Sequence, residues 1–245
     1  MGMRMLGKMA GEGEGFDGSD LNTAKETFEA LGKTCELYDL RQLGPADADL
    51  PEAQVLVIRN AASLFGHMGD MKRELLAFEW DTKYWDTRRK RVLNKQARSN
   101  VCFDEEGSAP DYENKQGTVV AWSDVPSVLQ IRSGLEIILG KKGKDLVCEG
   151  NRYFSHRCGI GFHGDSERRK VAGVRFGVSM SMHWCWHYQY SAVGCKLELD
   201  LHDGDMYIMS EKAVGTDWKR KNVYTLRHAA GAAKYLKEKR RVVEA

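Results

Sequence analysis

The second half of the chain, from Val147 onward, is a series of short runs with the composition of β-strands. They are rich in aromatic and β-branched residues and are separated by Gly, Asp or Asn. In "KLELDLHDG" the alternation is strict, so Leu197, Leu199 and Leu201 share one face of an extended segment. No helical segment separates the runs, which favours an antiparallel sandwich or barrel. The runs are "RKVAGVRFG", "SMSMHWCWHYQY", "CKLELDLHDGDMYIM" and "NVYTLRHAA".

The first half of the chain mixes helical and strand-like segments. Residues 23–33 have the pattern of a short amphipathic helix closed by Gly32, and residues 71–80 that of a second helix. Residues 54–61, "QVLVIRNA", predict a strand, and residues 126–140 open with Pro and close with Gly, as helices often do. The sequence therefore predicts an α+β protein that is mainly β, with its helices before the strand-rich part.

This change of texture suggests an organisation in three parts. Residues 1–20, which are Gly-rich and partly acidic, are expected to be a flexible N-terminus. Residues 21–118 would hold the N-terminal helices, a strand and a basic segment. Residues 119–245 would form the β core that carries the site.

Bulk properties narrow the class of protein. No apolar run approaches the length that crosses a bilayer, and the N-terminus lacks the apolar region of a secretory signal. The six cysteines form no C-x-x-C pair, which suggests reduced thiols in an intracellular protein. The net charge of +2 favours no partner by itself. We expect a monomer that does not bind membranes.

The segment "GIGFHGDSERRK" contains the pair His163-x-Asp165. Residues i and i+2 of an extended chain point to the same side, so both side chains can reach one ion. Two histidines and one carboxylate on one face are the ligands of mononuclear non-heme iron(II), with positions left open for a co-substrate and oxygen. A His-x-Asp pair alone is common by chance, and a third ligand must come from elsewhere.

Four histidines follow Asp165 in the chain. His183 and His187 lie in an aromatic run that predicts a packed wall, and His202 directly precedes the Asp203-Gly204 turn. His228 ends a strand-like run and is followed by small residues that leave room for a metal. The sequence therefore favours His228 as the third ligand.

The segment "EGNRYFSHRCGIGFHGDSE" resembles the AlkB branch of the 2-oxoglutarate- and iron(II)-dependent dioxygenases. That family has Asn-x-Tyr on the strand before a His-x-Asp, and an acidic residue two positions further on. Asn151, Tyr153, His163, Asp165 and Glu167 occupy these places. "RKVAGVRFG" and "LDLHDGDMYIM" resemble the family's following strands, so the resemblance covers about residues 120–231.

The resemblance implies a double-stranded β-helix, or jelly-roll, with iron at its open end. It implies Fe(II), 2-oxoglutarate and O2 as cofactor and co-substrates, and hydrogen bonds from Asn151 and Tyr153 to 2-oxoglutarate. An arginine should bind the distal carboxylate, because its planar fork matches a carboxylate.

Two assignments of the third ligand and this arginine stay open. If His228 is the ligand, Arg240 is the leading candidate for the carboxylate. If "VYTLRHAAG" is instead the family's final strand, Arg227 binds the carboxylate, and the third ligand is absent or is Asp217 in "GTDWK". Neighbours on one strand face opposite ways, so Arg227 and His228 cannot both point at the metal.

A basic segment, residues 82–100, precedes the β core. Its cations are interleaved with Tyr84 and Trp85, a composition suited to phosphate contacts and base stacking. By the resemblance it would form a lid over the iron, with Arg98 and Glu167 also contacting a flipped base of single-stranded DNA or RNA. A solvated, charged helix face is the plain alternative. The cations are Lys83, Arg88, Arg89, Lys90, Arg91, Lys95 and Arg98.

Three functions fit the sequence. The first is oxidative demethylation or hydroxylation of an alkylated or methylated nucleic-acid base. The second is hydroxylation of a protein side chain or a small molecule by a dioxygenase of the same fold. The third is a degenerate jelly-roll that binds a partner without turnover.

Overall fold

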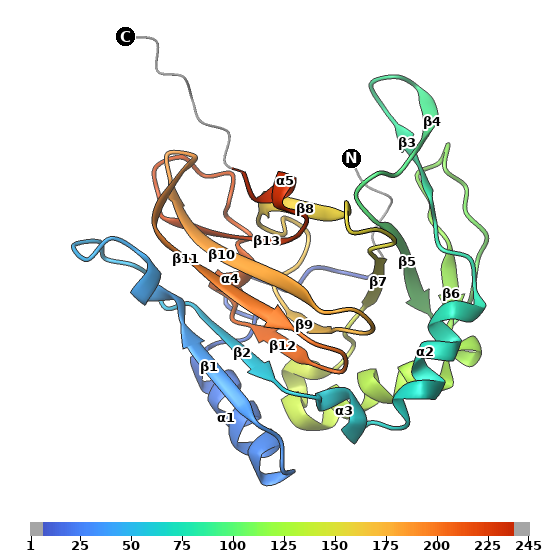
Figure 1. The fold of residues 1–245 in the computed structure, drawn as a ribbon, viewed down its shortest axis with the longest axis horizontal. Helices are drawn as coiled ribbons and strands as arrows, with labels where there is room; N and C mark the ends of the chain where they lie inside the picture. Colours follow the sequence, from blue (N-terminus) through green and yellow to red (C-terminus); the bar gives the residue numbers. More distant parts are fainter. Residues whose placement is uncertain (1–6, 238–245) are drawn as a thin grey trace.

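The structure, a computed structural model, describes residues 7–237 of the chain. It is mostly β, with few helices, as the sequence predicts (Figure 1). The helices are α1 (Gly18–Ala30), α2 (Met68–Ala77), α3 (Pro126–Gly143), α4 (Glu211–Val214) and α5 (Ala233–Leu236). The strands are β1 (Cys35–Asp39), β2 (Gln54–Ile58), β3 (Lys83–Asp86), β4 (Arg91–Asn94), β5 (Ser99–Asp104), β6 (Val119–Ala121), β7 (Cys148–Arg152), β8 (Gly159–His163), β9 (Val171–Val174), β10 (Met180–Tyr188), β11 (Ser191–Leu201), β12 (Met206–Met209) and β13 (Thr225–Gly231).

Two four-stranded antiparallel sheets form the centre of the molecule. The first has the order β1-β2-β12-β9 and the second the order β11-β10-β13-β8. A smaller sheet, β6-β5-β7, lies beside them, and β3 and β4 form a separate hairpin. Among residues 7–237 the sheets do not close into a barrel.

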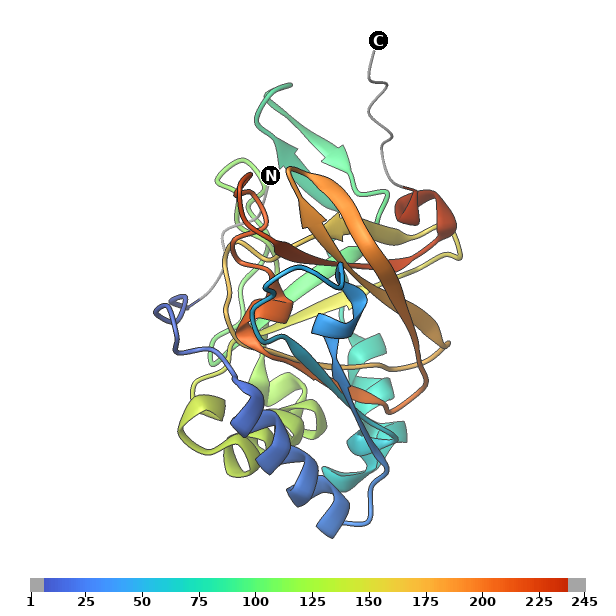
Figure 2. The ribbon, with the colours of Figure 1, turned by 90° about the vertical axis from the view of Figure 1, so that its left-hand side faces the viewer.

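The sheet β1-β2-β12-β9 has an apolar core on each face because its residues alternate. Leu56 and Ile58 of β2 face the core shared with α1 and α3, whereas Val55 and Val57 face the second four-stranded sheet. From that second sheet Trp184 and other aliphatic residues fill the space between the sheets. Figures 1 and 2 show the resulting order of helices, sheet and sheet.

The predicted aromatic wall in "HWCWHYQY" is confirmed. Trp184 and Trp186 of β10 are fully buried between the sheets, while His183 and His187 lie on the opposite face of the strand. The predicted alternation in β11 is confirmed as well, since Leu199 and the other leucines of that run join the same core.

The N-terminal segment is held more firmly than expected for a flexible residue range 1–20. Phe16 is buried in the core, and the backbone N–H groups of Gly13 and Gly15 donate to Glu211 of α4. Helix α1 begins at Gly18 rather than at residue 23, because Asp17 caps its N-terminus and Asp20 completes a capping box. The expectation of a flexible terminus is therefore wrong from Gly13 onward.

The division expected at residue 118 does not separate two units. Strand β2, from the first half of the chain, pairs with β12 from the second half. Strand β5 likewise pairs with both β6 and β7 across that boundary. The two halves therefore share their sheets.

The basic segment forms a β-hairpin. Lys83 pairs with Asn94 and Asp86 with Arg91, so the cations of residues 88–90 lie at the turn. The hairpin extends away from the rest of the molecule in both Figure 1 and Figure 2. A two-stranded hairpin is marginally stable alone, so it depends on its anchorage beside β5.

The helices carry no membrane-spanning segment. Within residues 7–237, none is both long enough and apolar enough to cross a bilayer.

Candidate metal centre

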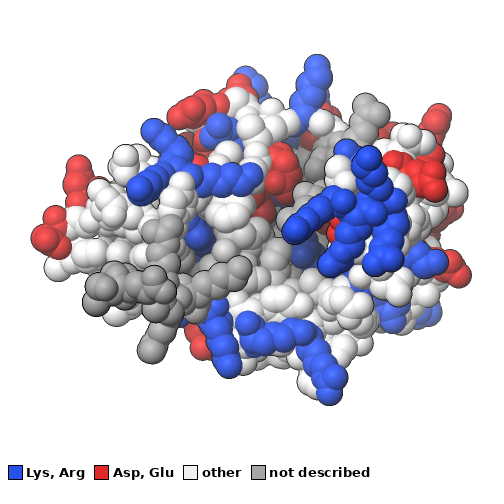
Figure 3. All heavy atoms as spheres, turned by 90° about the horizontal axis from the view of Figure 1, so that it is seen from above, with Lys and Arg blue, Asp and Glu red and all other residues white. Residues whose placement is uncertain are grey.

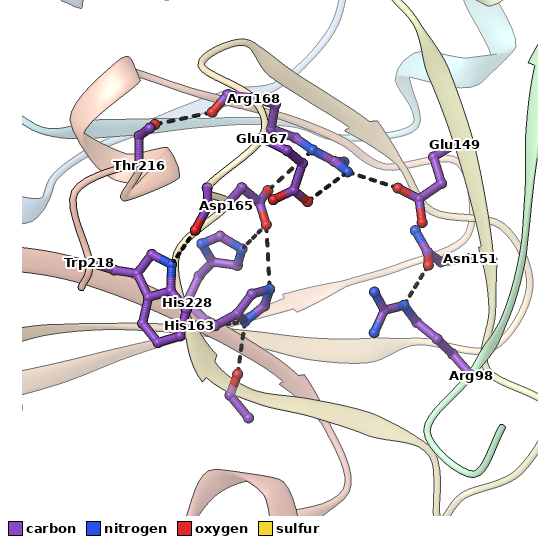
Figure 4. A network of polar contacts seen from close by, with 12 residues as sticks. Arg98, Glu149, Asn151, His163, Asp165, Glu167, Arg168, Thr216, Trp218 and His228 are labelled. Carbon is purple, nitrogen blue, oxygen red and sulfur yellow. Dashed lines mark hydrogen bonds and ion pairs between the residues drawn. The ribbon is translucent and has the colours of Figure 1, made fainter. Parts of the chain in front are cut away.

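His163, Asp165 and His228 come together at one end of the second four-stranded sheet (Figure 4). His163 is the last residue of β8, and the register pairs it directly with His228 of β13. Leu226 and Ala230, two positions either side of His228, lie in the core between the sheets. His228 therefore points to the inside, by the alternation of an extended strand.

The loop that carries Asp165 packs closely on the end of α4. The backbone N–H of Asp165 donates to the carbonyl of Val214, with 3.0 Å between N and O. A Cβ at Gly164 would lie 1.9 Å from the carbonyl oxygen of Gly215, so only glycine allows this approach. The contact with α4 sets the position of Asp165 beside the two histidines.

The distances within the group fit one metal ion. Oδ1 of Asp165 lies 3.5 Å from Nε2 of His163 and 3.8 Å from Nε2 of His228, and one ligand atom from each residue can be chosen so that all are within 4.8 Å of one another. Nitrogen and oxygen ligands lie about 2 Å from a first-row metal, so ligands of one ion are about 3–4 Å apart. A shift below an ångström would bring all three onto one ion.

The tautomer of His163 also suits a ligand. Its Nδ1 lies 2.8 Å from the carbonyl oxygen of Gly161 and 3.1 Å from that of His228. Carbonyl oxygens only accept hydrogen bonds, so Nδ1 carries the proton and the lone pair of Nε2 faces Asp165. Hydrogen bonding of the distal ring nitrogen in this way is usual for metal-bound histidines.

The protonation states are those that a metal requires. Burial would raise the pKa of Asp165, but the side-chain contact with His163 and the charges of His228 and Arg168 lower it to about 2. Burial lowers the pKa of His228 from 6.5 to about 4, although Asp165 opposes this shift. At neutral pH the carboxylate is thus ionised and His228 is neutral, as metal ligands must be.

A polar network supports the carboxylate from the side of β7. Nε of Arg168 lies 3.8 Å from Asp165, and its NH2 group lies 2.8 Å from Glu149 of β7 and 3.3 Å from Glu167 (Figure 4). Glu167 is more exposed than Glu149. The sequence did not point to Glu149, because its contact with Arg168 depends on the tertiary position of β7.

The other residues expected at the site are distributed as follows. Asn151 of β7 accepts a hydrogen bond from Arg98, so these two predicted residues contact each other (Figure 4). Tyr153 follows β7 and lies where the charge of Arg98 affects its pKa. Tyr84 and Trp85 lie on β3, in the hairpin. They line a cavity of about 620 Å³ together with the residues of the turn.

The structure distinguishes between the two open assignments of the third ligand. Asp217 forms an ion pair with Lys212, 2.7 Å long, and is not part of the metal-ligand group found among residues 7–237. Arg227 lies on the face of β13 opposite His228, with its guanidinium over the ring of Trp218 and bonded to the carbonyl of that residue. Its expected role at the distal carboxylate is therefore wrong for this arrangement. Arg240 lies outside the described residues.

No protein-family model matches this sequence. The chain is 41% identical over 245 residues to "Uncharacterized protein R156" of Acanthamoeba polyphaga mimivirus, an alignment that covers 97% of this chain and 92% of the viral protein. This chain therefore belongs to the same family as the mimivirus protein R156.

Proposed function

We propose that this protein is a 2-oxoglutarate- and iron(II)-dependent dioxygenase with a jelly-roll core, acting on an alkylated or methylated base of a nucleic acid. The observation that carries the proposal is the group of two histidines and one carboxylate, His163, Asp165 and His228. This ligand set with open positions is typical of non-heme iron(II) oxygenases. The resemblance of the surrounding motifs to the AlkB branch supports the same conclusion.

The residues around the group would prepare it for the metal. Arg168 and Glu149 hold the Asp165 carboxylate in place, and the core around His228 keeps water from its ring. When bound, iron would supply the oxidation of a substrate C–H bond by O2, coupled to the conversion of 2-oxoglutarate into succinate and carbon dioxide. The chain itself would orient the substrate carbon and keep the oxidant from side reactions.

A cationic surface supports a nucleic-acid substrate. Figure 3 shows lysine and arginine side chains gathered on the face seen from above, on either side of a hollow. The hairpin supplies exposed cations, among them Arg88 and Arg91, next to the aromatic side chains of Tyr84 and Trp85. Cations bind phosphates and aromatic rings stack on bases, so the combination suits a single strand.

The iron-dependent reaction is tested by measuring succinate formed from 2-oxoglutarate by protein loaded with Fe(II). Asp165→Ala and His228→Ala should each abolish turnover, whereas His202→Ala, on an exposed turn, should retain it. Full turnover by His228→Ala would exclude it as a ligand. Absence of succinate with every substrate offered would favour a binding protein without turnover.

Nucleic-acid binding is tested separately. Binding of a single-stranded oligonucleotide should weaken with salt, with a slope in log–log form of about −0.7 for each phosphate contact. Replacing Arg88 and Arg91 with serine should reduce that slope by about 1.4. Replacing Lys25 and Lys33, on and directly after α1, is the matched control and should leave the slope unchanged. Equal slopes for both double variants would contradict a role for the hairpin.

A further inference from the structure

Arg175 is an enclosed cation without a carboxylate partner in the part of the chain that the structure describes. It directly follows β9, and its backbone is fixed by hydrogen bonds to the turn before β12, N–H to Asp205 and C=O from Gly204, each 2.8 Å long. Its guanidinium donates to the carbonyl of Val178, a neutral group. The charge of Asp203 reaches it, but that carboxylate is bonded to Lys72.

Such a charge is costly to bury. Desolvation lowers the pKa of Arg175, which means that its surroundings disfavour the charged form. An enclosed cation is normally paired with an anion. The remaining fork of the guanidinium can therefore receive one from a ligand.

Two tyrosines lie beside this guanidinium. The carbon at the centre of the Arg175 guanidinium is 5.9 Å from the centre of the Tyr153 ring. Tyr207 of β12 is paired with Gly173, two residues before Arg175, and its ring occupies the space where a side chain at position 173 would lie. Neither hydroxyl bonds to another group within residues 7–237, so both are available to a ligand oxygen.

Arg175 and the metal group belong to one space. Gly173 and Arg175 share a face of the chain, and Tyr207 on that face lies in the core between the sheets, toward which His228 also points. Burial raises the pKa of Tyr207, and the charges of Asp165, Arg168 and Arg175 all act on this hydroxyl. Tyr207 is thus near both the metal group and Arg175.

We propose that Arg175, together with the hydroxyls of Tyr153 and Tyr207, binds the carboxylate of 2-oxoglutarate that does not chelate the metal. This inference rests on the proposed function and names the residues that select a dicarboxylic over a monocarboxylic 2-oxo acid. The other arginines near the site are engaged elsewhere: Arg168 with Glu149 and Asp165, and Arg98 with Asn151.

The test compares two 2-oxo acids that differ only in the distal carboxylate. Fe(II)-loaded protein is titrated without oxygen with 2-oxoglutarate and with 2-oxobutyrate, and binding is read from the absorption band of the iron-bound 2-oxo acid. The wild type should prefer 2-oxoglutarate by about 10- to 100-fold, the range of hydrogen bonds between charged groups. Arg175→Gln should lose this preference while binding 2-oxobutyrate as the wild type does.

Two further variants keep the result interpretable. Tyr207→Phe retains the ring and removes one hydroxyl, and should weaken 2-oxoglutarate by several-fold without changing 2-oxobutyrate. Arg227→Gln, on the opposite face of its sheet, is the matched control and should keep the full preference. A full preference in both Arg175→Gln and Tyr207→Phe would overturn this inference and leave the proposed function standing, as would loss of the preference in Arg240→Gln alone. If the wild type binds neither acid, the proposed function fails with it.

Discussion

Gly164, between His163 and Asp165, offers a direct test of how the chain holds the metal group. In Gly164→Ala the new methyl would lie 1.9 Å from the carbonyl oxygen of Gly215 and 2.8 Å from Cβ of Trp218. Gly215 cannot move freely, because it closes α4 with a φ of 75° and donates to Lys212. The loop must instead move away from α4, which stretches the hydrogen bond from Asp165 to Val214.

Overpacking of this kind costs about 1–3 kcal/mol, and each kcal/mol lowers the melting temperature of a chain of this size by about 2–4 °C. We therefore expect Gly164→Ala to melt about 2–12 °C below the wild type. Displacement of Asp165 should also weaken metal binding by about tenfold or more, since about 1.4 kcal/mol corresponds to a factor of ten.

The assay is thermal unfolding with and without saturating Mn(II), because a metal that binds only the folded state raises the melting temperature. Gly161→Ala, in the same strand, is the control. The nearest atom to its new methyl is the carbonyl oxygen of Tyr235 at 3.2 Å, which demands only a small adjustment. A Gly164→Ala protein with the melting temperature and the Mn(II) response of the wild type would refute the role given to this contact.

Three further predictions concern stability. Trp184→Ala removes a fully buried ring between the sheets and should lower the free energy of unfolding by about 3–5 kcal/mol, measured by urea denaturation. Asp17→Ala removes the capping box of α1 and should cost about 1 kcal/mol in the same assay, with no change in metal binding. Hydrogen bonds from Arg59 and Tyr38 lower the pKa of Glu36 below 4.5, so its stabilisation is present above pH 4.5 and is lost as the pH falls through the lowered pKa. Urea midpoints should therefore decline less below pH 4.5 in Glu36→Gln than in the wild type; equal declines would show that Glu36 is not responsible.

Local pattern was sufficient where the chain's own periodicity decides the structure. Alternation identified the strand that carries Leu199, because one face of β11 is buried against the other sheet. The i, i+2 spacing of His163 and Asp165 placed both on one side, and the small residues after His228 fitted its position beside them. These features depend on a few neighbouring residues, and the structure brings all three ligand candidates together.

Contacts between distant segments could not be read in this way. The partners of Arg168 include Glu149, 19 residues earlier, and their meeting depends on where β7 lies beside the metal group. Tyr207 reaches Arg175 only because β12 pairs with β9 and because Gly173 leaves space for its ring. The basic segment has no apolar alternation, so its charge pattern did not distinguish a helix face from the hairpin that forms.

The N-terminal segment is part of the support of the metal group, although it lies far from it in sequence. Glu211, the first residue of α4, accepts hydrogen bonds from the backbone of Gly13 and Gly15 and pairs with Arg169 at 2.6 Å. The same short helix ends in Val214, whose carbonyl fixes the backbone of Asp165. Because α4 has only four residues, its position depends on such contacts rather than on its own stability. The segment before α1 and the loop that carries Asp165 are thus joined through one turn of helix, which explains in physical terms why residues 13–16 are ordered.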